Sequence, residues 1–301
     1  MGWIGTGRMG SAMVSRLLDR GCDLSIYNRT REKTEPFRAQ GARIVAAPAD
    51  LADRDIVFTS VSRSEDFADV LTGPNGLLSR GGKGPTVVVD TSTVSMDVTA
   101  EVRRQAAPLG TALLAAPVSG NPKVVRSGRL TIAASGPVSA FETALPYLRV
   151  LAASVTYVGE GERARLVKIC HNLLLDVFTQ ALAETTVLAE RGGIARADYL
   201  AFINGSVMGS TFSRYKTPAF VNLDFTPTMT GRLMRKDLEL GLEVGRQLNV
   251  PLPVTALTHQ IVVSLIGQGL GDSDFGALLE LEARSANFEL VPDDRQVSDG
   301  L

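Results

Sequence analysis

The sequence predicts an α/β protein in which a doubly wound parallel sheet is followed by an all-α domain. In the first half of the chain, short apolar runs alternate with segments of helical periodicity, which is the pattern of a sheet covered by helices. Near residue 161 the alternation stops and long helical patterns begin. We therefore expect a first domain at residues 1–160 and a helical second domain at residues 161–301.

A glycine-rich turn opens the first domain, directly after a short apolar run. Gly5, Gly7 and Gly10 fit the pattern GxGxxG; residues 11–20 follow with a helical pattern, and residues 23–27 with a strand pattern. In this context the first glycine allows the tight turn, the second lets the backbone approach a pyrophosphate, and the third packs helix on strand. The helix N-terminus adds free N–H groups. The pattern predicts a Rossmann-type dinucleotide-binding domain, with an ordinary glycine turn as the alternative.

The residues after the second strand bear on the choice of cofactor. An acidic residue at this point would bind the ribose of NAD, but the sequence here is Asn28-Arg29-Thr30, with Lys33 one turn later. A guanidinium binds a 2′-phosphate through two parallel hydrogen bonds and also stacks on adenine. We expect NADP, with NAD as the less favoured cofactor. The alternative is that Arg29 and Lys33 are ordinary solvated charges.

The other secondary-structure elements follow from the same periodicities. Further strands are expected at residues 43–45, 56–61, 86–90, 112–116, 130–134 and 155–158. Helices are expected at residues 163–191, 197–204, 232–248, 254–268 and 275–284. The pattern at 163–191 is too long for a simple crossover helix, so it begins the second domain. Its apolar faces exceed what one small helical domain can cover, which predicts a homodimer or higher homo-oligomer.

Composition excludes several other classes of protein. The chain has 301 residues, is 45% hydrophobic and carries 31 basic against 32 acidic side chains. We find no basic patch typical of nucleic-acid binding and no uninterrupted apolar run near the ~20 residues that span a bilayer. With only two cysteines and no signal-like segment, we expect a cytoplasmic protein without disulfides or a metal site. Cys170 is expected to pack within its helix, with a reactive thiol beside Lys168 as the alternative.

Lys168 and Asn172 are four residues apart in the predicted helix 163–191. Residues at this spacing lie on one helical face, so an amine and an amide there can contact the same small molecule. A lysine can remove the proton that must leave a hydroxyl as hydride departs, and return it in the reverse reaction. Burial would lower the lysine pKa towards neutrality. The alternative is a surface lysine with a partly buried stem.

Five motifs in order give the chain a resemblance to the β-hydroxyacid dehydrogenase family, which includes 3-hydroxyisobutyrate dehydrogenase and NADPH-linked semialdehyde and glyoxylate reductases. The motifs are Gly5-Thr-Gly-Arg-Met-Gly10, Asp90-Thr-Ser-Thr93, Ala116-Pro-Val-Ser-Gly120, Gly159-Glu-Gly161 with Lys168-Ile-Cys-His-Asn172, and Arg235-Lys-Asp-Leu238. The resemblance spans nearly the whole chain. It implies hydride transfer between a nicotinamide and a short β-hydroxy acid or its semialdehyde.

The resemblance also implies residue roles. Lys168 is expected to be catalytic and Asn172 to orient the substrate, while Ser119 and Gly120 resemble the loop that holds its carboxylate. We add Asn121 and Asp237 as substrate-binding candidates, although Asp237 is as well explained by pairing within its helix. The cofactor-binding candidates surround the expected strand ends and the second-domain helix: Gly5, Thr6, Gly7, Arg8, Met9, Gly10, Asn28, Arg29, Thr30, Val61, Ser62, Thr93 and Lys236.

Two positions depart from the family pattern. Asn121 stands where a second glycine is usual, and His171 where many members have the first of two asparagines. His171 either faces the substrate, where it would titrate near pH 6.5, or packs against neighbouring helices. Two other functions remain as alternatives: an imine reductase, although those proteins generally lack the lysine, and a dinucleotide-binding module without catalysis.

Overall fold

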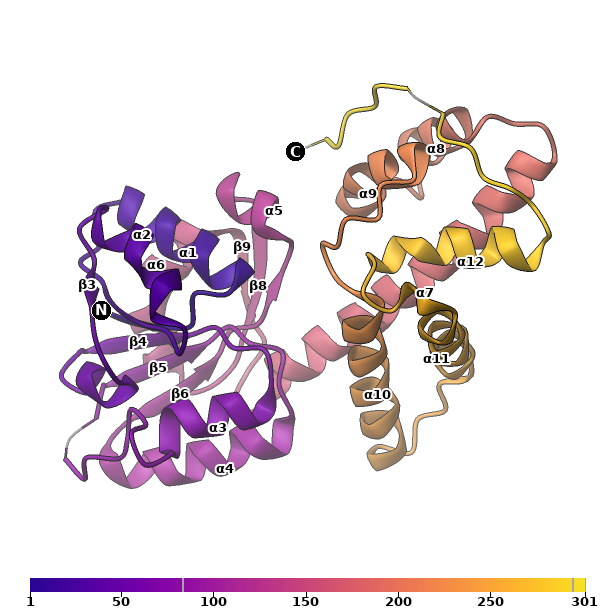
Figure 1. Ribbon diagram of the computed structural model, residues 1–301. Coiled ribbons are helices and arrows are strands. Elements are labelled where there is room, and N and C mark those ends of the chain that lie inside the picture. The colour runs from indigo at the N-terminus through magenta and orange to yellow at the C-terminus, as the bar shows by residue number, and fades with distance from the viewer. Residues whose placement is uncertain (83, 294, 301) are drawn as a thin grey trace. The chain divides into compact units, whose positions relative to one another are not determined.

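A computed structural model describes residues 1–82, 84–293 and 295–300 of the chain (Figure 1). The chain forms two compact units, Met1–Lys168 and Ile169–Leu301. The first unit contains all the strands of the described residues, and the second is helical. Helix α7, Arg163–Arg191, begins in the first unit and continues through the second. The α/β class and the order of its two parts agree with the prediction.

The first unit is built on a parallel sheet with the strand order β3-β2-β1-β4-β5-β6. Its strands are β1 (Gly2–Ile4), β2 (Ser25–Tyr27), β3 (Arg43–Ile44), β4 (Ile56–Thr59), β5 (Val87–Asp90) and β6 (Ala112–Ala115). All five neighbouring pairs are parallel. In this strand order the connections reverse direction between β1 and β4, and dinucleotides bind at the carboxyl ends of strands at such a point.

Helices cover both faces of this sheet. In Figure 1, α1 (Arg8–Asp19) and α6 (Val138–Leu151) lie on one face, and α3 (Ser64–Thr72) and α4 (Met96–Ala106) lie on the other. The short helix α2 spans Glu35–Arg38. Under α3 and α4, a core joins side chains of the central strands to the two helices: Ile4, Val57, Val88, Leu113, Phe67, Leu71 and Val102. Central strands buried on both faces explain their continuous apolar sequence.

A second, smaller sheet has the order β7-β8-β9. Its strands are β7 (Val118–Ser119), β8 (Leu130–Ala134) and β9 (Ala152–Tyr157), and the short helix α5 (Pro122–Arg126) connects the first two. Strand β7 pairs antiparallel with β8, whereas β8 and β9 are parallel. The two-residue strand β7 and helix α5 were not expected, because each is too short for a periodic pattern.

The second unit continues α7 with five more α-helices: α8 (Arg196–Gly205), α9 (Thr211–Asn222), α10 (Gly231–Gln247), α11 (Pro253–Leu265) and α12 (Leu278–Ser285). Helix α9 was missed because Pro218 interrupts its pattern; its start is fixed instead by a capping box between Ser210 and Ser213. The expected helix 254–268 ends in a π-helical turn, Ile266–Leu270, where Gly269 has a positive φ of 85°.

Helix α7 is long and apolar enough, by length and composition, to cross a membrane. An 18-residue window has a mean hydropathy of 1.2, and 44% of that window is buried within the protein. The sequence reading missed this because polar residues interrupt the apolar ones. A core helix of a water-soluble protein meets the same criterion, so length and composition do not distinguish a membrane-spanning helix from a buried core helix.

Candidate active site

The glycine-rich turn has the geometry that a dinucleotide requires. Gly5 has a φ of +98°, and a Cβ on it would lie 2.2 Å from the carbonyl oxygen of Ser60. A Cβ on Gly10 would lie 2.1 Å from the carbonyl oxygen of Gly5, whereas one on Gly7 would meet nothing within 4 Å. Gly5 and Gly10 therefore serve the fold, and Gly7 leaves open space at the N-terminus of α1. Backbone N–H groups there suit a pyrophosphate.

The neighbouring residues of the turn are held in place by hydrogen bonds. The Thr6 N–H donates to Asn28 Oδ1 at 2.9 Å, which joins the turn to the end of β2. Thr6 Oγ1 is buried and has no hydrogen-bond partner among the described residues, so a bound ligand could supply one. Arg8 is exposed and Met9 is half-buried on the first turn of α1. The turn and its surroundings fit a dinucleotide.

Arg29 extends from the end of β2 and forms an ion pair with Asp66 of α3 at 2.8 Å. Arg63, which sequence reasoning missed, reaches the other oxygen of the same carboxylate at 3.5 Å. Both guanidiniums are largely exposed, at 76% and 67% of their side chains. Thr30 is exposed, and its carbonyl oxygen accepts from Asn28 Nδ2. Arg63 lies two residues after the predicted strand 56–61, and this position was the signal that could have identified it.

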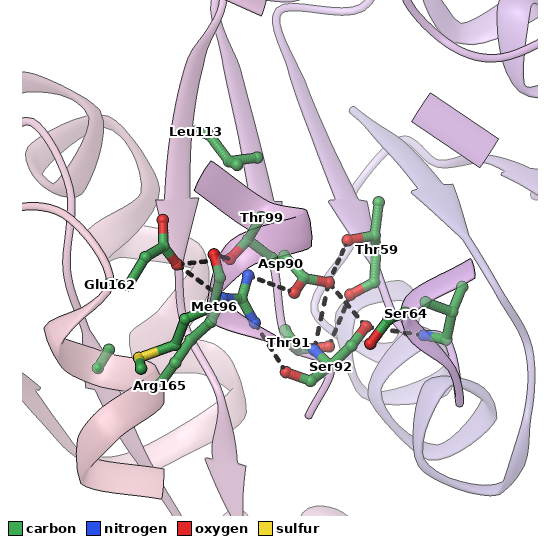
Figure 2. A network of polar contacts seen from close by, with 12 residues as sticks. Thr59, Ser64, Asp90, Thr91, Ser92, Met96, Thr99, Leu113, Glu162 and Arg165 are labelled. Carbon is green, nitrogen blue, oxygen red and sulfur yellow. Dashed lines mark hydrogen bonds and ion pairs between the residues drawn. The ribbon is translucent and has the colours of Figure 1, made fainter. Parts of the chain in front are cut away.

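The ends of β4 and β5 are joined through Asp90, a completely buried residue. Asp90 Oδ1 accepts hydrogen bonds from Thr59 Oγ1 at 2.5 Å and from Ser92 Oγ at 2.7 Å. Ser92 Oγ in turn accepts from the backbone N–H of Val61 at 2.9 Å. Figure 2 shows the bonds of Thr59, Asp90 and Ser92 at these strand ends. Val61 and Thr93, two of the predicted cofactor contacts, follow the adjacent strands β4 and β5 that these bonds join. Ser62 follows Val61 and is exposed.

The predicted carboxylate-binding loop follows β7. Ser119 is half-buried at the end of this strand, and Gly120 has a φ of +136°. A Cβ on Gly120 would lie 2.8 Å from both Leu130 and Val124, so only glycine fits here. Asn121 Oδ1 accepts from the N–H groups of Lys123 and Val124 at 2.9 and 3.1 Å. Its carboxamide oxygen caps α5, a role that the sequence reading did not include.

Lys168 and Asn172 lie one turn apart on α7, as predicted from their spacing. Asn172 is 4% exposed, and its Nδ2 donates to Asp237 Oδ2 of α10 at 2.7 Å. Asp237 Oδ1 lies 3.4 Å from the Nζ of its neighbour Lys236. A Cβ on Gly241, one turn after Asp237, would lie 2.4 Å from Leu173, so the two helices pack closely here. The structure therefore brings together three of the predicted residues, Asn172, Asp237 and Lys236.

Two residues of α7 differ from what their sequence context suggested. Cys170 is exposed, so the expectation that it packs within the helix is wrong. His171 is also exposed, and its Nδ1 lies 3.1 Å from Asn172 Oδ1. Both residues point away from the buried face that carries Ile169, Asn172 and Leu173. Within the described ranges, no group of three or more His, Cys, Asp or Glu could hold a metal ion.

Comparisons with known proteins identify the family. Residues 1–159 match the family model for the NAD binding domain of 6-phosphogluconate dehydrogenase. Residues 162–281 match the model for NAD-binding of NADP-dependent 3-hydroxyisobutyrate dehydrogenase. The chain is 34% identical over 284 residues to 2-(hydroxymethyl)glutarate dehydrogenase of Eubacterium barkeri, an alignment that covers 93% of this chain and 94% of the relative.

Solved structures agree with this assignment. The crystal structure of 3-hydroxyisobutyrate dehydrogenase from Salmonella typhimurium has a TM-score of 0.83 and 25% identity, covering 93% of this chain and 98% of that one. Psf3 in complex with NADP+ and 2-OPP has a TM-score of 0.82 and 26% identity, covering 93% and 99%. The resemblance inferred from the five motifs is confirmed. The chain belongs to the β-hydroxyacid dehydrogenase family, whose members bind a nicotinamide dinucleotide and carry out oxidoreduction at the CH–OH group of small hydroxy acids.

Proposed function

We propose that this enzyme uses NADP to interconvert a short β-hydroxy acid and its semialdehyde, with Lys168 as the general acid and base. The observation that carries the proposal is the arrangement on α7 and α10. Lys168 lies one turn before Asn172, and Asn172 is fixed by a 2.7 Å hydrogen bond to Asp237. An amide that is already held in one orientation can orient a substrate oxygen with little loss of side-chain entropy.

The proposed chemistry is simple. The bound dinucleotide supplies or accepts the hydride. In the oxidation direction the neutral amine of Lys168 removes the proton of the substrate hydroxyl, and in reduction its ammonium returns that proton to the carbonyl oxygen. Ser119 and the backbone of Gly120 are proposed to bind the substrate carboxylate by hydrogen bonds without net charge. Asn121, whose oxygen caps α5, is proposed to shape that loop.

The substrate class is supported by the relatives' names. Both 2-(hydroxymethyl)glutarate and 3-hydroxyisobutyrate carry a hydroxymethyl group on the carbon next to a carboxylate. We propose the same unit, a 2-substituted 3-hydroxypropanoate or its aldehyde, for this enzyme. The proposal is tested by following NADPH and NADH at 340 nm with methylmalonate semialdehyde, succinic semialdehyde, glyoxylate, tartronate semialdehyde and cyclic imines. Turnover of imines alone would instead favour an imine reductase.

Lys168→Ala tests the catalytic role. Turnover should fall by at least about 100-fold, the usual lower range for general acid–base catalysis, while NADPH affinity and thermal stability remain unchanged. Cys170→Ala, on the same helix, is the control and should retain full activity. If Lys168→Ala stays within about threefold of the parent, the lysine is not the acid–base group. If the parent binds NADPH but reduces none of the panel, the dinucleotide-binding module without catalysis gains support.

We propose a preference for NADP because the guanidiniums of Arg29 and Arg63 already contact one anionic group, the carboxylate of Asp66, through its two oxygens. A 2′-phosphate would bind the same two groups. Arg29→Asp should weaken NADPH binding by roughly 10-fold or more, because a charged hydrogen bond contributes ~1.5–3 kcal/mol, and should favour NADH. Asp66→Asn should do the opposite, because it removes a competitor for the phosphate. Unchanged ratios of NADPH to NADH affinity in both variants would contradict the proposal.

We also propose that the enzyme is a cytoplasmic homodimer. The helical unit exposes several large apolar side chains, including Leu174 at 71%, Leu188 at 73% and Phe202 at 73%. Exposed apolar side chains gathered on one unit are typical of an interface between subunits. Both cysteines are free, in keeping with a reducing compartment. Sedimentation equilibrium should give twice the chain mass, and Leu174→Glu should shift the protein towards a monomer.

A further inference from the structure

The first turn of α7 is anchored by Arg165, whose guanidinium is only 2% exposed although it carries a full charge. All three of its nitrogens are engaged (Figure 2). Nη2 donates to Asp90 Oδ2 at 2.7 Å, Nη1 donates to the carbonyl oxygen of Ser92 at 3.1 Å, and Nε donates to Glu162 Oε2 at 2.8 Å. The ring of Phe67 lies 5.7 Å from the guanidinium carbon.

Glu162, the residue before α7, extends the same network to α4. Its Oε1 is 2.7 Å from Arg103 Nη2, and its Oε2 accepts from Thr99 Oγ1 at 2.8 Å. Burial raises the pKa of Glu162, but the charges of Arg165 and Arg103 outweigh burial and leave the pKa below its ordinary value. Glu162 is therefore a carboxylate, and the start of α7 is attached both to α4 and to the end of β5.

The network leads to two groups of proposed functional residues. Asp90 accepts from Arg165 on one oxygen, and on the other it accepts from Thr59 and from Ser92, which holds the N–H of Val61. Lys168 follows Arg165 by three residues on the same helix, the spacing of neighbours on one face. A single buried carboxylate thus connects the strand ends proposed for the cofactor with the helical turn that carries Lys168.

Stability alone is a poor explanation for such a network. Removing a guanidinium and a carboxylate from water costs several kcal/mol per ion, and apolar side chains of similar size often stabilise a fold as well or better. What a fully bonded guanidinium adds is a fixed direction and distance at each bond. A misplacement of only ~1 Å at a reacting centre can lower the rate by about 100-fold.

We infer that Arg165 and Asp90 are positioning residues, which hold the Lys168 turn of α7 in a fixed place relative to the ends of β4 and β5. The inference rests on the proposed role of Lys168. It assigns no contact with substrate or cofactor to either residue. It predicts that losing Arg165 lowers kcat while the binding of NADPH is kept, because Val61 and Ser92 retain their bond to each other.

The test compares Arg165→Met with a matched variant of another buried arginine. Arg196, at the start of α8, is completely buried; its Nη2 donates to the carbonyl oxygen of Val291 and to Asp293 Oδ1, and its Nη1 lies 3.6 Å from Glu190 Oε2. Glu190 is twenty-two residues after Lys168, or ~33 Å along the helix at 1.5 Å per residue. Arg196→Met therefore removes another buried, ion-paired guanidinium far along α7 from the proposed acid–base group, one with fewer hydrogen bonds than that of Arg165.

For Arg165→Met we expect kcat to fall by about 100-fold, with KM and Kd for NADPH within about threefold of the parent. Arg196→Met should also lower the melting temperature but keep kcat per folded molecule within about threefold. Arg165→Lys keeps one charged bond to Asp90 and should recover part of kcat. If the methionine variants fail to fold, Arg165→Lys and Arg196→Lys are compared in their place.

Equal effects of the Arg165 and Arg196 substitutions on kcat would overturn the inference, and so would an Arg165 variant with unchanged kcat. Lys168→Ala separates this failure from that of the proposed function. If Lys168→Ala abolishes turnover while the Arg165 and Arg196 variants behave alike, only the positioning role is wrong. If Lys168→Ala retains turnover, the proposed function fails first.

Discussion

Two buried ion pairs, one in each unit, have nearly the same geometry but connect different parts of the molecule. Arg165 and Asp90 are 2.7 Å apart in the first unit, and Lys216 and Asp274 are 2.6 Å apart in the second. None of the four side chains is more than 2% exposed. Asp274 also accepts from Thr228 and from the N–H of Gly276. Both carboxylates are thus fully bonded.

The difference lies in what the bonded neighbours are. Among the partners of Asp90, Ser92 is bonded to the N–H of Val61, and Arg165 lies three residues before Lys168 on α7. Val61 and Lys168 are both predicted to be functional. The partners of Asp274 lie in α9 and in the segments that precede α10 and α12, where none of the predicted site residues is found. Burial and ion pairing alone therefore do not identify a functional residue. The elements that the pair connects are more informative.

The largest expected effect comes from removing either carboxylate. Asp274→Ala should lower the free energy of unfolding by ~3–5 kcal/mol, because it leaves the buried Lys216 without its ion-pair partner. Asp90→Ala should cost less, because Arg165 keeps its ion pair with Glu162. Urea unfolding measures this loss. Only Asp90→Ala should also raise the KM for NADPH and lower kcat, since only Asp90 holds the Val61 strand end. If Asp274→Ala changes these constants as much, the functional distinction between the pairs is lost.

A second pair of substitutions applies the same distinction to the glycine turn. Gly10→Ala should cost ~1–3 kcal/mol of unfolding free energy, because the new methyl group overlaps the backbone oxygen of Gly5. Gly7→Ala meets no atom within 4 Å and should cost less than ~0.5 kcal/mol. It should nevertheless weaken NADPH binding by roughly 10-fold, or ~1.4 kcal/mol, by obstructing the pyrophosphate. Unchanged NADPH affinity in Gly7→Ala would contradict the proposed binding mode.

The smallest effect concerns acid stability. The pKa of Asp274 is raised by burial but lowered further by Lys216 and Thr228, so it lies below the ordinary 3.8, as that of Glu162 lies below 4.5. A depressed carboxylate pKa stabilises the fold above the ordinary pKa, and this contribution is lost as the pH falls through the folded value. The unfolding free energy should therefore decline below about pH 4.5. The unfolding free energy of Glu162→Gln should decline less steeply as the pH falls. An unchanged slope would argue against the Glu162 network.

Sequence periodicity predicted much of the fold but missed elements whose pattern is interrupted. Helix α7 has the predicted bounds, Arg163–Arg191. In the first domain, helices after residue 20 were expected between the strands without bounds, and α3, α4 and α6 occupy such places. Helix α9 was not predicted, and it contains an internal proline, Pro218. Proline removes one backbone hydrogen bond and disfavours a helix locally. Packing of the remaining turns outweighs that cost, and a local sequence reading does not include packing.

The sequence alone determined the chemistry available to this protein, and the tertiary structure decided which groups meet. The glycine spacing and the four-residue interval between Lys168 and Asn172 follow from local geometry, because a tight turn and a helical face are set by neighbouring residues. Arg165 and Asp90 are 75 residues apart in the chain, and Asn172 and Asp237 are 65 apart. Their contacts depend on how strands and helices pack, since no local periodicity links residues so distant.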